Sequence, residues 1–294
     1  MANTALVWIR DDFRIQNNDA LTYATNQHDV VTAVFIFNSN IFDRRREAQK
    51  WWVSKSLENF KSDLKNLNIG LEIIKDDEIN FFSKIKSNSK ISVYWNKVYE
   101  PNELEKDKKI GANFSKKNID FKFFKGNVLN EYNKITKNDG TPFKVFSPFW
   151  RNAEQFYLER LPDKISKVKK CKKINTLFKN QIKSEDILPK SDWYKKFEKY
   201  WEPSEQKAHE NLDNFVNKSI LNYGVDRDFP SIKGTSLLSP YIRNGQINVG
   251  DIWQKCKKLK SNNVSIKKYT NEIGWREFSH SLINYFPQML KGNL

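Results

Sequence analysis

Strand-length apolar runs alternate with helical patterns over the first ~125 residues, and this alternation constrains the fold more than any other feature. The runs occupy residues 6–9, 31–37, 71–74, 91–95 and 121–124. They are continuously apolar, which is typical of strands covered on both faces, as in a parallel sheet. The alternation predicts a doubly wound, Rossmann-like α/β domain, which we place at residues 1–128.

The segments between these runs carry the period of an amphipathic helix, most clearly between the second and third runs. There, apolar side chains recur at steps of three and four residues, at Val53, Leu57, Phe60, Leu64 and Leu67. Gly70 follows this pattern, and we expect the helix to stop at that glycine.

The strand pattern disappears in the second half of the chain. Residues 126–150 contain turn formers, and residues 160–200 are rich in lysine with scattered apolar positions. Irregular segments of this length are uncommon inside one compact domain, so we expect an interdomain connector over residues 129–203. Helical patterns then cover residues 204–220, 239–244, 249–260 and 270–285. They predict an all-α domain over residues 204–294.

The chain carries 51 Lys and Arg against 35 Asp and Glu, a formal net charge of +16. The first 100 residues hold 14 basic and 13 acidic side chains, the next 100 hold 24 and 13, and the rest hold 13 and 9. Such an excess indicates a polyanionic partner, either nucleic acid or an anionic membrane surface. The alternative is compositional, because an AT-rich genome also favours a chain rich in Lys, Asn, Ile and Phe.

Cysteine and histidine are sparse in this sequence. Cys171 and Cys256 stand far apart and outside any Cys-x-x-Cys pair, which argues against disulfides and zinc sites. His28, His209 and His280 form no cluster, so we expect no metal site and no histidine-based hydrolytic triad. The N-terminus lacks a signal-peptide pattern, and no apolar stretch approaches the ~20 residues that span a bilayer. We therefore expect a cytoplasmic protein without a membrane partner.

One loop combines hydroxyl side chains with the start of a helix. Thr235 and Ser236 precede Ser239 and Pro240, and a Ser-Pro pair is typical of an N-cap followed by the first helical residue. Gly245 supplies the stop signal. Hydroxyls and free amides gathered at a helix N-terminus suit a phosphate group. The alternative is a capped surface helix behind a Ser/Thr loop.

Three side chains share one face of the last predicted helix. Glu272, Trp275 and Arg276 occupy an arc of about 100°, so an acceptor, a flat aromatic and a cation can project into one cavity. There Trp can stack on a planar ring, and Arg can pair with a phosphate. Tyr223 and Arg227, just before the Thr/Ser loop, also suit a nucleotide site. The alternatives are a surface ion pair beside a half-buried core Trp, and Tyr and Arg packed at a domain surface.

Four segments resemble motifs of the photolyase/cryptochrome family and occur in the family's order. Residues 8–21 (WIRDDFRIQNNDAL) resemble the opening motif W-F-R-x-D-L-R-x-x-D-N-x-A-L. Residues 144–150 (KVFSPFW) resemble the segment that leaves the family's antenna domain. Residues 234–241 (GTSLLSPY) resemble the flavin-phosphate motif G-T-S-x-L-S-P-Y-L, and residues 272–278 (EIGWREF) resemble E-L-x-W-R-E-F. In combination, these motifs are specific for the family.

The resemblance implies FAD as the cofactor, active in its reduced form, and light as the energy source. It implies a monomer whose partner is UV-damaged DNA containing pyrimidine dimers. It implies flavin contacts from Tyr223, Thr235, Ser236, Leu237, Leu238, Ser239, Tyr269 and Arg276, with Tyr269 standing where the family often has Trp. It implies DNA contacts from Arg227, Glu272, Trp275 and Arg276. Glu272 and Trp275 would face the dimer as the catalytic pair.

The reaction implied by the resemblance is that of a deoxyribodipyrimidine photo-lyase. Photoexcited reduced FAD would donate an electron that splits a cyclobutane pyrimidine dimer flipped out of the duplex, and the electron would then return. Glu272 would hydrogen-bond a pyrimidine, and Trp275 would stack against it. Repair enzymes for (6-4) photoproducts typically have Gln at the position of Glu272, so the retained pair favours cyclobutane-dimer repair. A cryptochrome blue-light photoreceptor is the alternative.

Known members of the family continue well beyond the point where this sequence ends. We therefore expect an N-terminal portion that binds flavin poorly and repairs little alone, with an inactive flavin-free fragment as a further alternative. The family's α/β domain holds an antenna chromophore, either a folate (methenyltetrahydrofolate) or a deazaflavin. Asn102 and Glu103 resemble the folate-contact position of some bacterial members. Exposed polar residues that open a helix are the alternative interpretation of these two.

Overall fold

A five-stranded parallel sheet forms the first half of the protein. The computed structural model describes residues 4–42, 46–86, 90–160, 167–259 and 263–292. The strands are β1 (Thr4–Ile9), β2 (Val30–Phe37), β3 (Gly70–Lys75), β4 (Ile91–Asn96) and β5 (Phe121–Phe124), in the order β3-β2-β1-β4-β5. All four pairings are parallel, and each predicted strand is found within two residues of its expected bounds. The predicted doubly wound α/β fold is confirmed.

Helices cover both faces of the sheet, which explains why the strands are mostly apolar. α1 (Asp19–Gln27) and α3 (Glu47–Asn66) pack on the face that buries Val7 and Ile9. α4 (Glu78–Ser83) and α5 (Pro101–Lys116) pack on the face that buries Leu6 and Trp8. Successive β1 side chains therefore enter two different cores, as the pleat of a strand requires. The short α2 (Ser39–Phe42) follows β2.

The predicted helix stop at Gly70 is wrong. α3 ends at Asn66, and the residue with a left-handed backbone is Asn68, at φ 57°. Asparagine tolerates this conformation better than other residues with a side chain, so no glycine is needed there. Gly70 instead begins β3, where a Cβ atom would lie 2.9 Å from the Asn175 carbonyl oxygen.

Residues 167–199 are irregular apart from two 3₁₀ turns, Ser184–Ile187 and Asp192–Lys199, as the lysine-rich composition predicts. This segment is fixed to the α/β unit by backbone hydrogen bonds, among them Cys171 N to Leu67 O at 2.8 Å and Ile182 N to Ile73 O at 2.9 Å. The buried Glu72 carboxylate accepts bonds from the Leu177 and Phe178 amides at 2.6 and 2.9 Å. Residues 161–166 of the expected connector lie outside the described residues.

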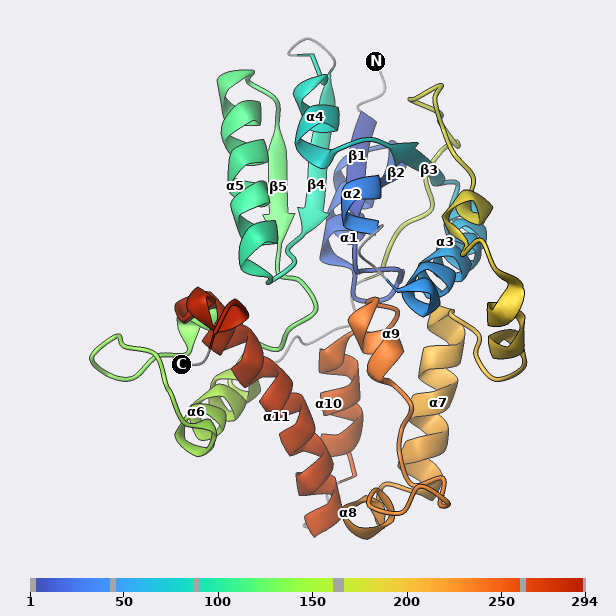
Figure 1. The fold of residues 1–294 in the computed structure, drawn as a ribbon. Coiled ribbons are helices and arrows are strands. Elements are labelled where there is room, and N and C mark those ends of the chain that lie inside the picture. Colours follow the sequence, from blue (N-terminus) through green and yellow to red (C-terminus); the bar gives the residue numbers. More distant parts are fainter. Residues whose placement is uncertain (1–3, 43–45, 87–89, 161–166, 260–262, 293–294) are drawn as a thin grey trace.

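The second half is helical in the described residues, with α7 (Glu205–Lys218), α8 (Tyr223–Asp226), α9 (Ser239–Arg243), α10 (Val249–Lys257) and α11 (Val264–Tyr285). α11 begins six residues before the predicted start, because the Asn263 side chain caps it by accepting a bond from the Ser265 amide. The predicted end of the third helix, residue 260, lies outside the described residues. α6 (Phe146–Leu158) packs beside α11, with Phe149 and Trp150 in the same apolar core (Figure 1).

The helical half lies below the sheet in Figure 1, and polar contacts join the two halves. The Glu205 carboxylate on α7 accepts bonds from the Ile15 and Gln16 amides at 2.6 and 2.9 Å. Arg14 donates to the Gly245 carbonyl oxygen at 3.0 Å. Among the described helices, none is long and apolar enough to cross a membrane. The described residues also contain no group of three or more His, Cys, Asp or Glu side chains placed to hold a metal ion.

Candidate functional site

A cavity of about 730 Å³ lies between the carboxyl ends of β1 and β4 and the helical half. Asp11 follows β1, and Tyr99 and Glu100 follow β4, so these three residues form its wall on the sheet side. β1 and β4 are the neighbours at which the strand order reverses. Loops diverge at such a point and leave a crevice, which is where open α/β sheets bind their ligands.

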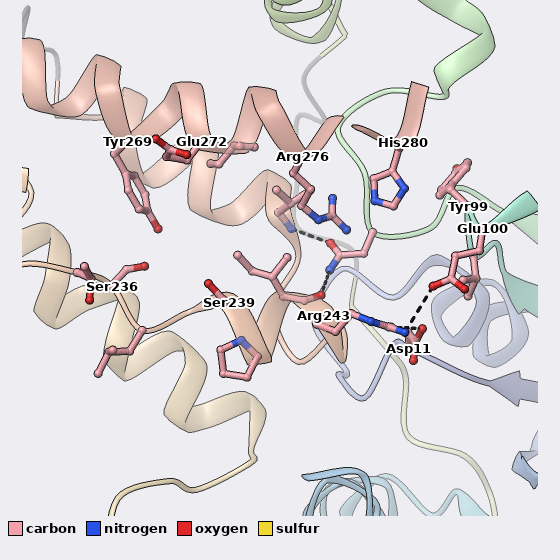
Figure 2. Close-up of a pocket in the computed structure, with 18 of the residues that line it drawn as sticks. Asp11, Tyr99, Glu100, Ser236, Ser239, Arg243, Tyr269, Glu272, Arg276 and His280 are labelled. Atoms are coloured by element: carbon pink, nitrogen blue, oxygen red, sulfur yellow. Dashed lines mark hydrogen bonds and ion pairs between the residues drawn. The ribbon is translucent and has the colours of Figure 1, made fainter. Parts of the chain in front are cut away.

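Helix α11 forms the opposite wall with one face. Tyr269, Glu272, Arg276 and His280 follow one another at steps of three or four residues and line the cavity (Figure 2), as does Ile273 next to Glu272. The expectation that Glu272 and Arg276 project into one cavity is therefore met. Trp275 was expected beside them, but it does not line this cavity.

The Trp275 ring turns toward α6 instead. Its ring centroid lies 3.8 Å from that of Phe146, and the two planes are within 8° of parallel. Trp275 is 48% exposed, so a large part of the residue is in contact with solvent. Helix spacing alone placed Trp275 within the arc, whereas the direction of its ring is set by a contact with a distant part of the chain.

The Thr/Ser loop enters the cavity with its hydroxyl side chains. Thr235, Ser236, Leu237 and Ser239 line the cavity, and Leu238 is buried in the core behind them. The expectation that Ser239 caps the helix is wrong, because Leu238 holds the N-cap position and Ser239 is already helical. α9 has only five residues, so hydroxyl groups rather than a helix terminus are the main polar feature here.

Two arginines line the cavity, Arg243 and Arg276, and they differ in their ion pairs and in the direction of their pKa shifts. Arg243 forms ion pairs with Asp11 and, at 3.5 Å, with Glu100, and the Asp11 charge raises its pKa. Burial lowers the pKa of Arg276, which forms an ion pair with Glu277 at 3.4 Å. Both Glu277 oxygens are engaged, because the second accepts the Leu129 and Asn130 amides at 2.9 and 3.1 Å. Arg276 is therefore a partly buried cation with a weak anionic partner.

Arg227 joins two of the predicted site residues at the outer end of the cavity. Its guanidinium donates to the Tyr223 hydroxyl at 3.0 Å and forms an ion pair with Glu272. Tyr223 and Glu272 line the cavity, whereas Arg227 lies beside it. Burial raises the pKa of Tyr223, so this phenol stays protonated at neutral pH. The arrangement holds the Glu272 carboxylate in a fixed place while leaving it half-exposed.

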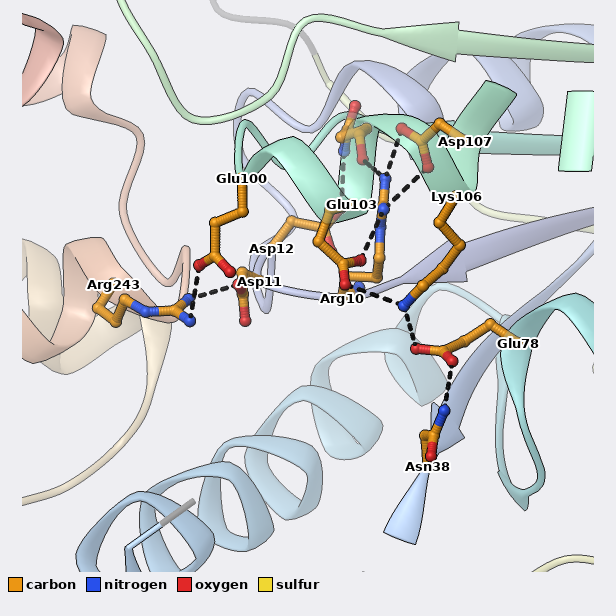
Figure 3. Close-up of polar contacts among 11 residues, drawn as sticks. Arg10, Asp11, Asp12, Asn38, Glu78, Glu100, Glu103, Lys106, Asp107 and Arg243 are labelled. Atoms are coloured by element: carbon orange, nitrogen blue, oxygen red, sulfur yellow. Dashed lines mark hydrogen bonds and ion pairs between the residues drawn. The ribbon is translucent and has the colours of Figure 1, made fainter. Parts of the chain in front are cut away.

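Asn102 and Glu103 open α5, away from the main cavity. Glu103 forms ion pairs with Arg10 at 3.3 Å and with Lys106 at 2.9 Å (Figure 3). It also lines a separate cavity of about 90 Å³, which shares Asp11, Glu100 and Arg243 with the large one. Asn102 is exposed. In the structure, Glu103 is thus held by ion pairs within the protein, and a chromophore contact stays a prediction for both residues.

The sequence analysis missed several residues that line the cavity, chiefly Asp11, Tyr99, Glu100, Arg243 and His280. For Asp11 and Glu100 a signal was present, because both follow predicted strands whose carboxyl ends meet at the reversal point. His280 carried no such signal. It is partly buried, its Nδ1 is buried without a hydrogen-bond partner among the described residues, and burial with the charges of Arg276 and Arg243 lowers its pKa to about 3.

Comparisons with known proteins agree on one family. The family model described as DNA photolyase matches residues 5–167, more than half of the chain. A deoxyribodipyrimidine photo-lyase of Agrobacterium fabrum is 30% identical over 98% of this chain and 60% of its own length. Cryptochrome-2 of Arabidopsis thaliana is 25% identical over 98% of this chain and 50% of its own length.

A solved class III photolyase from Agrobacterium tumefaciens superposes with a TM-score of 0.87 at 29% identity, over 98% of this chain and 60% of that one. A Synechocystis cryptochrome, at 16% identity and a TM-score of 0.86, shares the fold. The chain thus spans about half to 60% of the length of these relatives. It belongs to the DNA photolyase family.

Proposed function

We propose that this protein acts in light-dependent repair of UV-damaged DNA, in which cyclobutane pyrimidine dimers are split with the help of reduced FAD. One observation carries the proposal: the Glu272 carboxylate lines the same cavity as the hydroxyls of Thr235, Ser236 and Ser239. A flavin held by the loop and a dimer held at Glu272 would therefore be neighbours, as a direct transfer of an electron between them requires.

The residues of the cavity fit a flavin dinucleotide. Its volume of about 730 Å³ lies within the range of cofactor-sized pockets. Arg276 supplies a partly buried and weakly paired cation for a phosphate group, and His280 Nδ1 lacks a partner among the described residues. Tyr223 and Tyr269 supply flat aromatic walls, at a centroid separation of 5.1 Å. When bound and photoexcited, reduced FAD would supply the electron that opens the dimer, and the electron would then return to the flavin.

The residues of this chain bind and orient the two reactants. Thr235, Ser236 and Ser239 donate hydrogen bonds toward the phosphates, with Leu237, Leu238 and Tyr269 fixing the backbone and ring walls around them. Glu272 accepts a hydrogen bond from a pyrimidine N–H group. Arg227, which holds Glu272 in the DNA-free protein, pairs with a DNA phosphate when DNA arrives. Trp275 stacks on a pyrimidine flipped from the duplex.

A folate or deazaflavin antenna near Asn102 and Glu103 belongs to the same proposal. Glu103 lines the small cavity together with Arg10 and Trp8, and the Arg10 guanidinium lies 4.1 Å from the Trp8 ring centroid. Trp8 is buried and Arg10 is already paired with Glu103 and Asp107, so the proposal of an antenna contact rests on the family resemblance of Asn102 and Glu103.

A blue-light photoreceptor is the second candidate, favoured by the similarity to Cryptochrome-2 over 98% of this chain. The two functions differ in what light does to bound DNA. A photoreceptor changes state without consuming dimers, whereas a repair enzyme removes them.

The test is a count of dimers in an irradiated oligonucleotide after blue light, with protein reconstituted with reduced FAD. This chain alone is expected to bind flavin poorly and repair little, so we expect a slow light-dependent loss of dimers with the wild type and a rate at least tenfold lower for Glu272→Ala, as for a lost charged contact to the reacting group. Glu105→Ala removes an exposed carboxylate from α5 and serves as the matched control. Unchanged dimers with flavin bound would reject repair and leave the photoreceptor.

A further inference from the structure

Trp275 is a stacking surface with one covered face. Phe146 lies parallel to it at 3.8 Å between ring centroids, so one face of the indole is already occupied. Trp275 is nevertheless 48% exposed, so a large part of the side chain that Phe146 does not cover is open to solvent. We propose that Phe146 is a positioning residue that holds the Trp275 ring in one orientation and restricts it to stacking on a single planar base. The proposal rests on the proposed function for the identity of that base, a pyrimidine of damaged DNA.

Phe146 is itself held in place by the packing of α6 on α11. Phe278, one turn beyond Trp275, is buried and meets Phe146 edge-on at 6.1 Å and Trp275 edge-on at 6.0 Å. Phe149 on α6 packs against the same Phe278 ring at 5.1 Å. The three aromatic side chains around Trp275 thus form one cluster that extends into the core. Because Phe146 packs against this core, its contact with Trp275 limits the movement of the indole at the surface.

A glycine allows the two helices to approach closely enough for this contact. Gly274 directly precedes Trp275, and a Cβ atom there would lie 2.6 Å from Cδ2 of Trp150. Trp150 on α6 therefore lies directly against the α11 backbone. The glycine and the aromatic stack follow each other along α11, so the close crossing of α6 over α11 also sets the distance between Phe146 and Trp275.

Stacking against Phe146 has a physical consequence for ligand binding. An exposed Trp on a helix surface samples several rotamers, and a ligand that stacks on it must select one of them. Packing one face against a fixed phenyl ring removes most of this freedom before the ligand arrives, and such preorganisation raises affinity without a new ligand contact. Because the Phe146 and Trp275 rings are parallel, Phe146 covers one face of the indole and does not reach over the other face.

The surroundings of the platform suit a nucleic acid strand. Lys144 and Arg151 flank Phe146 in sequence and are exposed, as are Ser147 and Pro148 between them. Exposed cations close in sequence to an aromatic stacking surface suit the phosphates of a single strand or an extruded nucleotide.

The experiment compares Phe146→Leu, Phe146→Tyr and the neighbouring control Val145→Ala in the full 294-residue chain. Val145 is exposed and takes no part in the stack. Affinity for an oligonucleotide containing one thymine dimer is measured against the undamaged oligonucleotide. We expect Phe146→Leu to weaken dimer binding about two- to tenfold, the effect of one lost aromatic pair. Phe146→Tyr keeps the ring and should restore affinity, and Val145→Ala should leave it unchanged.

A second readout follows the ring itself. Tryptophan is replaced by 5-fluorotryptophan, and the ¹⁹F resonance of Trp275 is identified by its loss in Trp275→Phe. We expect this resonance to move and broaden in Phe146→Leu and to stay near its wild-type position in Phe146→Tyr. In a Trp275→Ala background, Phe146→Leu should have no further effect on DNA affinity, because the side chain through which it acts is gone.

Each result decides a separate point. An unmoved Trp275 resonance in Phe146→Leu overturns the proposal, and so does wild-type dimer affinity in Phe146→Leu when Trp275→Ala weakens it. If Trp275→Ala itself leaves dimer affinity unchanged, the proposed DNA contact of Trp275 fails. The ¹⁹F comparison then still decides whether Phe146 fixes the ring.

Discussion

His280 is a partly buried imidazole with two arginines nearby. Burial and the charges of Arg276 and Arg243 lower its pKa to about 3, and the Tyr99 ring lies 6.1 Å away between centroids. At neutral pH the ring is therefore uncharged and can offer one donor and one acceptor to the cavity. Protonation would add a third positive charge to a site that already holds two.

The titration of His280 predicts a pH dependence of stability. In the unfolded chain the imidazole binds a proton near pH 6.5, whereas in the folded protein it does so only near pH 3. Between these values the unfolded state holds more protons, so acidification favours unfolding by up to about 1.4 kcal/mol per pH unit. We expect the wild type to lose stability faster than His280→Gln as pH falls from 6.5 toward 3.

Urea denaturation of both proteins at several pH values in this window measures the difference. Other groups titrate there too, among them the buried Glu277, whose pKa burial raises. Since both proteins share these groups, the subtraction isolates His280. Parallel curves for the two proteins would show that the imidazole is accessible to protons in the folded state.

At the residue scale, the sequence predicts the position of some side chains of the site and not of others. Glu272 and Arg276 reach the cavity as their helical spacing suggests, because both lie on the inner face of α11. Trp275 could not be placed in the same way, because its ring stacks on Phe146, which lies more than 120 residues earlier in the chain. Side-chain direction at the edge of a helical face depends on the neighbouring helix, which no local pattern describes.

At the scale of elements, the crossing of α6 and α11 depends on Gly274. Replacement by Ala would normally stabilise a helix by about 1 kcal/mol. Here the new methyl group would lie 2.6 Å from the Trp150 ring, so we expect Gly274→Ala to destabilise the protein by about 1–3 kcal/mol through overpacking. Thermal unfolding followed by circular dichroism measures the change.

Gly111 offers the matched control within α5. A Cβ atom there would meet the Phe121 ring at 3.1 Å, a contact that a small shift of that half-buried ring relieves. We expect Gly111→Ala to cost less than Gly274→Ala. Equal stability of Gly274→Ala and wild type would mean that α6 can move away from α11, and the rigid support proposed for Trp275 would be lost.

The strands were predictable as elements, and several helix boundaries were not. Short, mostly apolar runs located all five strands. β1 to β4 are buried along most of their length, whereas β5, at the edge of the sheet, leaves Lys122 and Phe123 exposed. Helix ends depend on single residues whose conformation is set by tertiary packing. Asn68 rather than Gly70 turns the chain after α3, and the buried Leu238 takes the cap position that Ser239 was expected to hold. Burial of Leu238 outweighs the better capping chemistry of serine.

At the scale of the whole molecule, Glu205 joins the helical half to the α/β half. Its buried carboxylate accepts the Ile15 and Gln16 amides at 2.6 and 2.9 Å. Glu205→Ala would leave both amides without this acceptor, which costs about 1–3 kcal/mol. We expect a lower unfolding midpoint and a broader transition, because the two halves would unfold less cooperatively.

Denaturant unfolding followed by two probes checks this expectation. Glu210→Ala on the same helix removes an exposed carboxylate and should leave the transition unchanged. A single sharp transition at the wild-type midpoint for Glu205→Ala would show that other contacts, such as the 3.0 Å bond from Arg14 to the Gly245 carbonyl, are sufficient to join the halves.

The cavity between the two halves brings together the residues on which the proposed function depends. The central claim is that a flavin bound by the loop at residues 235–239 and a dimer bound at Glu272 lie side by side. The measurement is the emission lifetime of the protein reconstituted with reduced FAD, with a dimer-containing oligonucleotide and with an undamaged one. We expect the emission lifetime to be shorter with the dimer-containing oligonucleotide than with the undamaged one. An unchanged lifetime while dimer DNA is demonstrably bound would contradict it.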